Sequence, residues 1–460
     1  MNETEHVFER LRSGTVPEKG LDKFAVGIDN PLNEIRRQFR MISSGEGAFK
    51  FLRGGYGCGK TFMSQYTLLE ALKDDFAVSF VVVSPNDTQF HKFDEVYHRI
   101  VSGLRTPMAA SGALEDAIDR WIARIEDRLT DEIGDDADDF DEQVKIRFES
   151  ELSELTKEAT GNEFISVLKA YFDAKQEGDY QAASSLISWI SGSKNVAASA
   201  KKRAGIKGEI SSASALLYLK GILNIIKKAG HKGLVIIVDE LETILRMRTD
   251  VRGKSLNGLR QIIDATKDFP GMLWVFTGTR EFFDSKKGVC GLEPLHDRIK
   301  FISSGGFVSP KQPQLELKPF DKQRLKAVAL KLREIFPCSN KSRIQNLVDD
   351  AFLDSLCDSV TEGFKGDVGV IPRQFLRELI TVLDLVEEHD GSDGGKEYIP
   401  KEVYNFSSNG LSEEEQCIVH GNTLLDGNTF LDGNTLLDKN TLSSTDENSD
   451  SGYEVQELEW

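Results

Sequence analysis

The chain has 460 residues, a formal charge of −18 at pH 7, and 39% hydrophobic residues. This length allows two or three domains, each with a core of its own. No stretch approaches the roughly 18 uninterrupted apolar residues that a membrane span needs, and the acidic N-terminus lacks the basic-then-apolar layout of a signal peptide. The sequence therefore predicts neither a membrane protein nor a secreted one.

The negative charge is concentrated in two segments. Residues 405–460 hold twelve acidic residues and one Lys, and residues 126–143 hold ten acidic residues and one Arg. The rest of the chain is close to neutral, so the acidic total does not exclude contact between its body and a nucleic acid. No long Lys/Arg stripe provides positive evidence for such contact.

The cysteines are scattered, with no C-x-x-C pair and no neighbouring His cluster. This pattern argues against a disulfide framework or a zinc site. It fits a reducing compartment, and we expect a cytoplasmic protein. The five positions are Cys58, Cys290, Cys338, Cys357 and Cys417.

A phosphate-binding loop of the pattern G-x-x-x-x-G-K-[ST] lies between an apolar strand at 48–52 and a segment with helical periodicity. Glycines let the backbone curl until several N–H groups converge on one anion, and the following helix adds the positive end of its dipole. Lys60 then reaches the β- and γ-phosphates, and the Thr61 hydroxyl can ligate Mg²⁺. ATP and Mg²⁺ are the predicted cofactors. The predicted nucleotide-binding residues are Gly54, Gly55, Tyr56, Gly57, Cys58, Gly59, Lys60, Thr61 and Phe62.

Further strands are predicted at 77–83, 234–238 and 273–277, alternating with helical segments. This alternation is typical of an α/β fold whose parallel sheet is flanked by helices. Well over a hundred residues separate the second strand from the third, far more than one crossover helix requires. We interpret residues 100–210 as a helical insertion, with the acidic segment 126–143 as a solvated loop inside it.

Polar residues follow the third and fourth strands. Asp239 is predicted to hold Mg²⁺, and Glu240 to act as the general base for the attacking water. After the fourth strand, Thr277 and Thr279 are both candidates for a side chain beside the γ-phosphate, which would lie between the first and third strands. Thr279 enters the predicted catalytic set, although alternation alone does not decide between the two.

Two arginines are further catalytic candidates. Arg298 lies where a helix after the fourth strand would end, and it could project toward a neighbouring subunit's nucleotide as an arginine finger. Arg373 follows Pro372, which favours the first turn of a helix, and it could reach back to the γ-phosphate. The alternative for each is a surface ion pair.

Four segments follow from these patterns: an N-terminal extension over 1–20, an ATPase core over 21–320, a helical lid domain over 321–404, and an acidic tail over 405–460. The tail contains three hexads beginning at Gly421, Gly427 and Gly433, each with the pattern G-N-T-[LF]-L-D. Three copies are too few for a solenoid, so we expect a disordered tail.

The motif set from Val26-Gly27 to Arg373 resembles the AAA+ class of P-loop NTPases, near its initiator and origin-recognition branch. The loop through Phe62 and the segments 189–192, 239–242 and 371–377 are more particularly similar to the BREX ATP-binding family of BrxC and BrxD, over about residues 20–400. The chain's size suits the smaller BrxD-like members. The resemblance implies a role in bacterial anti-phage defence, other defence-system proteins as partners, contact with DNA and a homo-oligomer in the ATP state.

The predicted function is therefore a Mg²⁺-dependent ATPase of a defence complex. One alternative is a nucleotide-gated adaptor with little hydrolysis. Another is an initiator-like DNA clamp or helicase loader, whose DNA affinity would fall steeply with salt.

Overall fold

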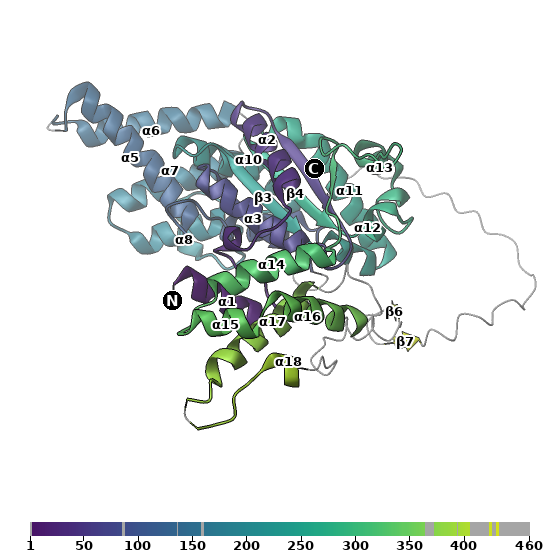
Figure 1. The fold of residues 1–460 in the computed structure, drawn as a ribbon. Coiled ribbons are helices and arrows are strands. Elements are labelled where there is room, and N and C mark those ends of the chain that lie inside the picture. The colour runs from purple at the N-terminus through teal and green to yellow at the C-terminus, as the bar shows by residue number, and fades with distance from the viewer. Residues whose placement is uncertain are drawn as a thin grey trace, which may run out of the picture. The chain divides into compact units, whose positions relative to one another are not determined.

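The computed structural model describes residues 2–84, 88–135, 137–157, 161–363, 372–392 and 394–404, together with 423–425 and 429–431. These residues fall into two compact units. The helical unit comprises the described parts of Met1–Ile28, Gly55–Phe62 and Lys318–Glu459, and the sheet unit comprises those of Asp29–Gly54 and Met63–Leu317. Figure 1 shows both units as ribbons.

The sheet unit is built on five parallel strands in the order β2-β3-β4-β1-β5. Strand β4 lies between β1 and β3, which confirms the sequence-based expectation for the fourth strand. All five carboxyl ends therefore lie at the same edge of the sheet. The strands are β1 (Ala48–Arg53), β2 (Ala77–Val82), β3 (Leu234–Asp239), β4 (Met272–Gly278) and β5 (Gln314–Glu316).

The central strands are apolar because helices cover both faces of a parallel sheet. Every residue of β3 and β4 is buried. Phe51 of β1 stacks on Phe276 of β4 with their ring centroids 5.0 Å apart, and Trp274 lies parallel to Phe276. This aromatic layer fixes the register of the two strands whose ends carry the predicted site.

Helices fill the long connection between β2 and β3, as predicted. They are α4 (Phe93–Ser102), α5 (Ala113–Ile133), α6 (Phe140–Lys157), α7 (Asn162–Gln176), α8 (Tyr180–Ile190), α9 (Ala198–Arg203) and α10 (Ser212–Lys228). In Figure 1, α5 and α6 project from the sheet as a helical hairpin.

The expectation of a loop over 126–143 was wrong. Helix α5 continues to Ile133 and α6 begins at Phe140, so most of this acidic segment is helical. Ile125 and Leu129 are buried in the amphipathic stripe of α5, and the carboxylates occupy its outer face. The charge indicated solvation correctly, but it did not exclude a helix.

Residues 189–192 attach the insertion to α4. Tyr97 donates a hydrogen bond to the Ile190 carbonyl at 2.6 Å, and His98 Nδ1 lies 2.7 Å from the Ser191 carbonyl oxygen. Gly192 has a φ of +78°, and a Cβ there would lie 3.1 Å from the Tyr97 ring. The segment is therefore a structural joint in this fold.

The remaining elements of the sheet unit surround the strands. Helix α3 (Lys60–Lys73) starts in the phosphate loop and continues into this unit. The others are α2 (Asp29–Ser43), η2 (Leu241–Arg246), α11 (Thr249–Ala265), η3 (Thr266–Asp268), α12 (Arg280–Asp284), η4 (Val289–Gly291) and α13 (Glu293–Ile299).

The helical unit has its own core, in which α1 packs on α17. Phe8 meets Phe336 edge-on at 5.2 Å, and Arg12 forms two hydrogen bonds of 2.7 Å with Asp384. The elements are α1 (Glu3–Arg12), η1 (Leu21–Lys23), α14 (Lys322–Ile335), α15 (Lys341–Leu347), α16 (Asp350–Gly363), α17 (Pro372–Glu388) and α18 (Pro400–Val403).

Two short strands come from the hexad repeats. β6 (Thr423–Leu425) pairs antiparallel with β7 (Thr429–Leu431). The rest of the predicted disordered tail lies outside the described residues. Among those residues, no helix combines the length and the apolar character that crossing a membrane requires.

Candidate functional site

The phosphate loop continues directly from β1. The amide of Gly54 donates to the Gly278 carbonyl at the end of β4, at 3.2 Å. Gly57 and Gly59 have φ values of +69° and +83°, the left-handed conformation that favours glycine. Lys60 Nζ donates to the Gly55 carbonyl at 3.0 Å and lies 5.4 Å from the Tyr56 ring centroid. The lysine therefore folds back over the curl of its own loop.

Within the helical unit, other segments pack on this loop. The rings of Phe62 and Phe24 meet edge-on at 5.5 Å, and a Cβ at Gly59 would lie 3.5 Å from the Phe320 ring. Arg324 of α14 donates to the Gly27 carbonyl at 3.2 Å, in the Val26-Gly27 turn. Segments before and after the sheet thus support the loop, which residue spacing did not predict.

At the end of β3, Asp239 is 3% exposed. The Thr277 hydroxyl of β4 donates a hydrogen bond to Asp239 Oδ1, and the Glu240 amide lies 3.1 Å from both Thr277 Oγ1 and Asp239 Oδ1. Glu240 itself is exposed and has a φ of +65°, one of two positive values among the described non-glycine residues. The buried carboxylate is held in place, while the next carboxylate projects outward from an uncommon backbone conformation.

Thr279 has a different setting. Its side chain caps α12 by accepting a hydrogen bond from the Phe282 amide at 3.4 Å. This is the ordinary role of a threonine at a helix start. Of the two candidates, Thr277 is the one whose hydroxyl contacts the predicted metal ligand.

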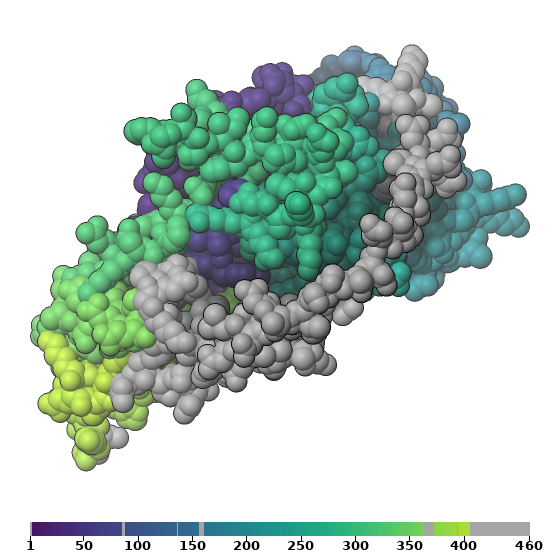
Figure 2. Space-filling model, turned by 90° about the vertical axis from the view of Figure 1, so that its right-hand side faces the viewer, coloured from purple at the N-terminus to yellow at the C-terminus, as the bar shows by residue number. Residues whose placement is uncertain are grey.

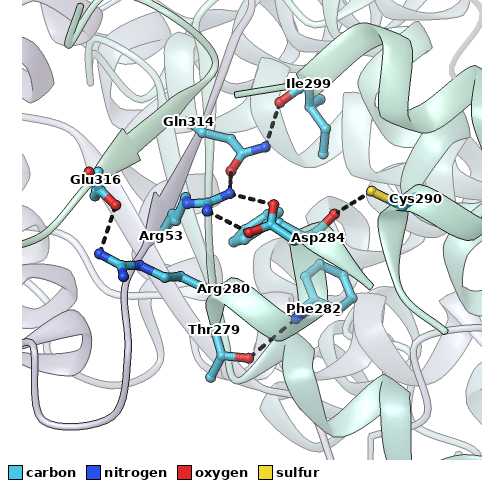
Figure 3. Close-up of polar contacts among 10 residues, drawn as sticks. Arg53, Thr279, Arg280, Phe282, Asp284, Cys290, Ile299, Gln314 and Glu316 are labelled. Atoms are coloured by element: carbon cyan, nitrogen blue, oxygen red, sulfur yellow. Dashed lines mark hydrogen bonds and ion pairs between the residues drawn. The ribbon is translucent and has the colours of Figure 1, made fainter. Parts of the chain in front are cut away.

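Arg53, the last residue of β1, also lies at the edge of the sheet where the strands have their carboxyl ends, and the sequence analysis did not identify it. Figure 3 shows its buried guanidinium between Asp284 of α12 and Gln314 of β5, with bonds of 2.6 and 2.8 Å to the Asp284 carboxylate and 3.2 Å to Gln314 Oε1. The Phe301 ring lies 4.5 Å from the guanidinium carbon. The signal available in the sequence was a basic residue directly after the predicted apolar strand at 48–52.

Figure 3 also shows the Cys290 thiol and a second ion pair. The Cys290 thiol donates to the Phe283 carbonyl, and burial, together with the nearby Asp284 carboxylate, raises the pKa of this thiol. Arg280, which opens α12, pairs with Glu316 of β5 at 2.9 Å. Strands β1 and β5 and helix α12 are therefore linked by two charged contacts.

The two candidate arginines lie at helix ends, as the spacing predicted. Arg298 lies in the last turn of α13, where it is 39% exposed and forms an ion pair with Asp264 of α11. Arg373 lies in the first turn of α17 and is exposed, with its aliphatic stem beside Gly14. These are positions only, and the roles of both residues remain predictions.

The residues present fit a nucleotide with a hard cation. The first turn of α3 contains no acidic residue, so its dipole is available to an anion, and Thr61 in that turn is exposed. The described residues include no cluster of three or more His, Cys, Asp or Glu side chains that could hold a metal. One hydroxyl and one carboxylate suit Mg²⁺, which keeps several waters and takes its other ligands from phosphates.

A parallel sheet in this strand order, a phosphate loop after β1 and an acidic pair after β3 define an AAA+ P-loop NTPase fold. The chain belongs to the family of BREX system ATP-binding proteins BrxC/D, whose family model matches residues 1–402. Nucleotide binding follows from that membership and agrees with the loop described above.

Other comparisons are remote. No curated protein matches the chain. Among solved structures, it is similar to a chain in the structure of Drosophila ORC bound to DNA, with 13% identity and a TM-score of 0.31, over 84% of this chain and 68% of that one.

Proposed function

We propose that this protein hydrolyses ATP with Mg²⁺ and couples its nucleotide state to the assembly or the DNA-associated activity of a BREX-type defence complex. The observation that carries the proposal is the arrangement at the ends of β3 and β4. There a buried Asp239 accepts from Thr277, and Glu240 projects outward beside it. A carboxylate held by a neighbouring strand is pre-positioned for a metal, and an outward carboxylate is suited to accept a proton from water.

In this proposal Lys60 and the loop amides bind the phosphates, while Thr61 and Asp239 hold the ion. When bound, Mg²⁺ neutralises charge that develops on the phosphate oxygens. Glu240 orients the attacking water and takes its proton. Thr277 keeps the Asp239 carboxylate oriented. We prefer Thr277 to Thr279 as the strand-end threonine of the site because its hydroxyl contacts that carboxylate, whereas the Thr279 hydroxyl caps α12.

Arg298 is proposed to complete the site of a neighbouring subunit in an ATP-state homo-oligomer, and Arg373 to respond to the γ-phosphate from the helical unit. Arg298 pairs with Asp264 in its own chain here, so that pair must open before the guanidinium can reach a neighbour. The same pair favours a second candidate, a nucleotide-gated adaptor in which the isolated chain binds ATP but turns it over slowly.

A binding experiment tests the metal assignment. Affinity for a fluorescent ATP analogue would be measured with Mg²⁺ and with EDTA, for the wild type, Thr61→Ala and Asp239→Asn. We expect Mg²⁺ to strengthen binding by the wild type and to have a much smaller effect on both variants. Equal Mg²⁺ dependence in all three proteins would refute the assigned ligands, and Thr279→Val serves as a control that should behave like the wild type.

A further inference from the structure

The loop between α13 and β5 forms a projecting hairpin, here called the 300–312 hairpin. Ser304 and Phe307 exchange two backbone hydrogen bonds of 3.1 and 3.0 Å across the Gly305-Gly306 turn. Both glycines have positive φ, +58° and +82°, as a tight two-residue hairpin turn requires. The tip is therefore a defined turn.

The base of the hairpin is anchored in the sheet unit. The Ile302 amide donates to Gln312 Oε1 at 2.8 Å, and Gln312 Nε2 donates back to the Ile302 carbonyl at 3.2 Å. Below this clamp, the buried Lys50 of β1 donates to the Gln312 carbonyl at 2.7 Å, and Phe301 packs on Arg53. The tip is thus held out from a fixed base.

The hairpin exposes an apolar side chain to water at its tip and another at its base. Phe307 is 84% exposed and Ile302 is 61% exposed, and Phe307 is the most exposed of the large hydrophobic residues described. A single exposed apolar residue needs no explanation, but an exposed aromatic ring at the end of an anchored hairpin is available to contact a binding partner. Figure 2 gives a space-filling view of the molecule, in which residues near position 300 have the green of the colour bar.

The charged residues of the hairpin and its immediate flanks in the sequence are all basic. From Arg298 to Gln314 the sequence contains Arg298, Lys300 and Lys311 and no acidic residue, in a chain whose formal charge is −18. Lys300 and Lys311 are exposed, and no ion pair joins either of them to any carboxylate in the described part of the chain. Ser303, Ser304 and Ser309 add hydroxyl groups along the two arms.

We propose that the 300–312 hairpin binds a single strand of nucleic acid, with the Phe307 ring stacked on an unpaired base and Lys300 and Lys311 on flanking phosphates. Stacking on an aromatic ring combined with a basic groove is the general chemistry of single-strand recognition. Gly305 and Gly306 carry no side chains, so a backbone can approach the tip closely. An unpaired base is favoured over a duplex because the bases of a duplex are stacked on one another and closed to the ring.

The test uses the full chain without nucleotide, so that its failure is distinct from failure of the proposed hydrolysis. Fluorescence anisotropy measures binding of a labelled oligothymidine of about 20 nucleotides and of a duplex of the same length. We expect tighter binding of the single strand, and a roughly 5- to 150-fold loss of affinity in Phe307→Ala, from the loss of one stacked base. Phe307→Trp should retain the affinity, and Tyr180→Ala, which removes a 69% exposed ring on α8, should leave it unchanged.

Salt dependence tests the lysines. The slope of log affinity against log salt should decrease in magnitude by about 1.4 in the Lys300→Gln, Lys311→Gln double variant, since each phosphate contact on a single strand contributes about 0.7. The matched control is Lys201→Gln with Lys202→Gln on α9, which should keep the wild-type slope. Circular dichroism and light scattering on every variant report folding and self-association.

Wild-type affinity in Phe307→Ala together with an unchanged slope in the lysine variant would overturn the proposal. So would the absence of binding to the single strand by the wild type. A change in self-association without any change in oligothymidine affinity would also overturn it, and would identify a second copy of the chain as the occupant of the hairpin.

Discussion

Replacing Thr277 by valine removes one hydroxyl from a site that has no exposure to water. Valine nearly preserves the shape of threonine, so no large cavity forms. The variant loses the hydrogen bond from Thr277 Oγ1 to Asp239 and the contact between Thr277 Oγ1 and the Glu240 amide, 3.1 Å apart. The Glu240 amide keeps its contact with Asp239, but the buried carboxylate loses the hydrogen bond that Thr277 donates.

The cost follows from the kind of bond removed. A hydrogen bond to a charged group contributes about 1.5–3 kcal/mol. We expect Thr277→Val to lower the free energy of unfolding of the sheet unit by that amount at neutral pH. If the same contact orients Asp239 for the metal, turnover should fall by at least about tenfold, because about 1.4 kcal/mol corresponds to a factor of ten.

Urea denaturation followed by tryptophan fluorescence measures the first effect, since Trp274 is buried on the same strand as Thr277. Steady-state ATP turnover measures the second. Thr279→Val is the matched control: it removes the 3.4 Å cap of α12, which should cost about 1 kcal/mol or less and leave turnover within about twofold. Unchanged stability in Thr277→Val, or a larger loss of turnover in Thr279→Val, would refute the reasoning.

Three further predictions concern other parts of the chain. The carboxylate of Glu34 pairs with Lys50 at 2.7 Å; burial raises the pKa of Glu34, but hydrogen bonds to the carboxylate outweigh burial and hold this pKa below its usual value. Glu34→Gln should therefore lower the free energy of unfolding by about 3–5 kcal/mol at pH 7, as measured by urea denaturation. The difference between the two proteins should shrink below about pH 4, because the stabilisation is lost as the pH falls through the lowered pKa. Lys60→Ala should abolish binding of a fluorescent ATP analogue, and Arg298→Ala should lower ATP turnover roughly 1,000-fold. Mixing the two inactive variants should restore part of the turnover only if Arg298 of one subunit acts on the nucleotide of another. Burial raises the pKa of Cys357 to about 12, so this thiol should resist iodoacetamide at pH 8 in the folded protein and react after denaturation, as mass spectrometry would detect.

The strands and the loop could be predicted because their signals are local. The run from Leu234 to Asp239 is apolar and then acidic, and the glycines of the loop are required by its own backbone. The polar end of the fourth strand was expected between the first and third strands, and β4 lies there. The helix start at Pro372 was likewise set by nearby residues, and the helix end predicted near Arg298 agrees with α13.

The contacts that distinguish one candidate from another depend on tertiary structure. Thr277 and Thr279 are both buried, and only the pairing of β3 with β4 brings Thr277 to Asp239. Arg53 meets Asp284 across 231 positions of sequence, so no spacing rule could join them. The acidic residues of 126–143 were misleading for a different reason, since charge on the outer face of a helix and charge in a loop have the same composition.

The central claim is that Glu240 is the base of an ATPase that works as an assembly. It is tested most directly by measuring ATP turnover together with light scattering after size exclusion, for the wild type and Glu240→Gln, with and without DNA. The account predicts that both proteins bind ATP and assemble in its presence, and that the variant alone loses turnover. A chain that stays monomeric with ATP and turns it over no faster than Glu240→Gln would contradict the claim and favour the nucleotide-gated adaptor.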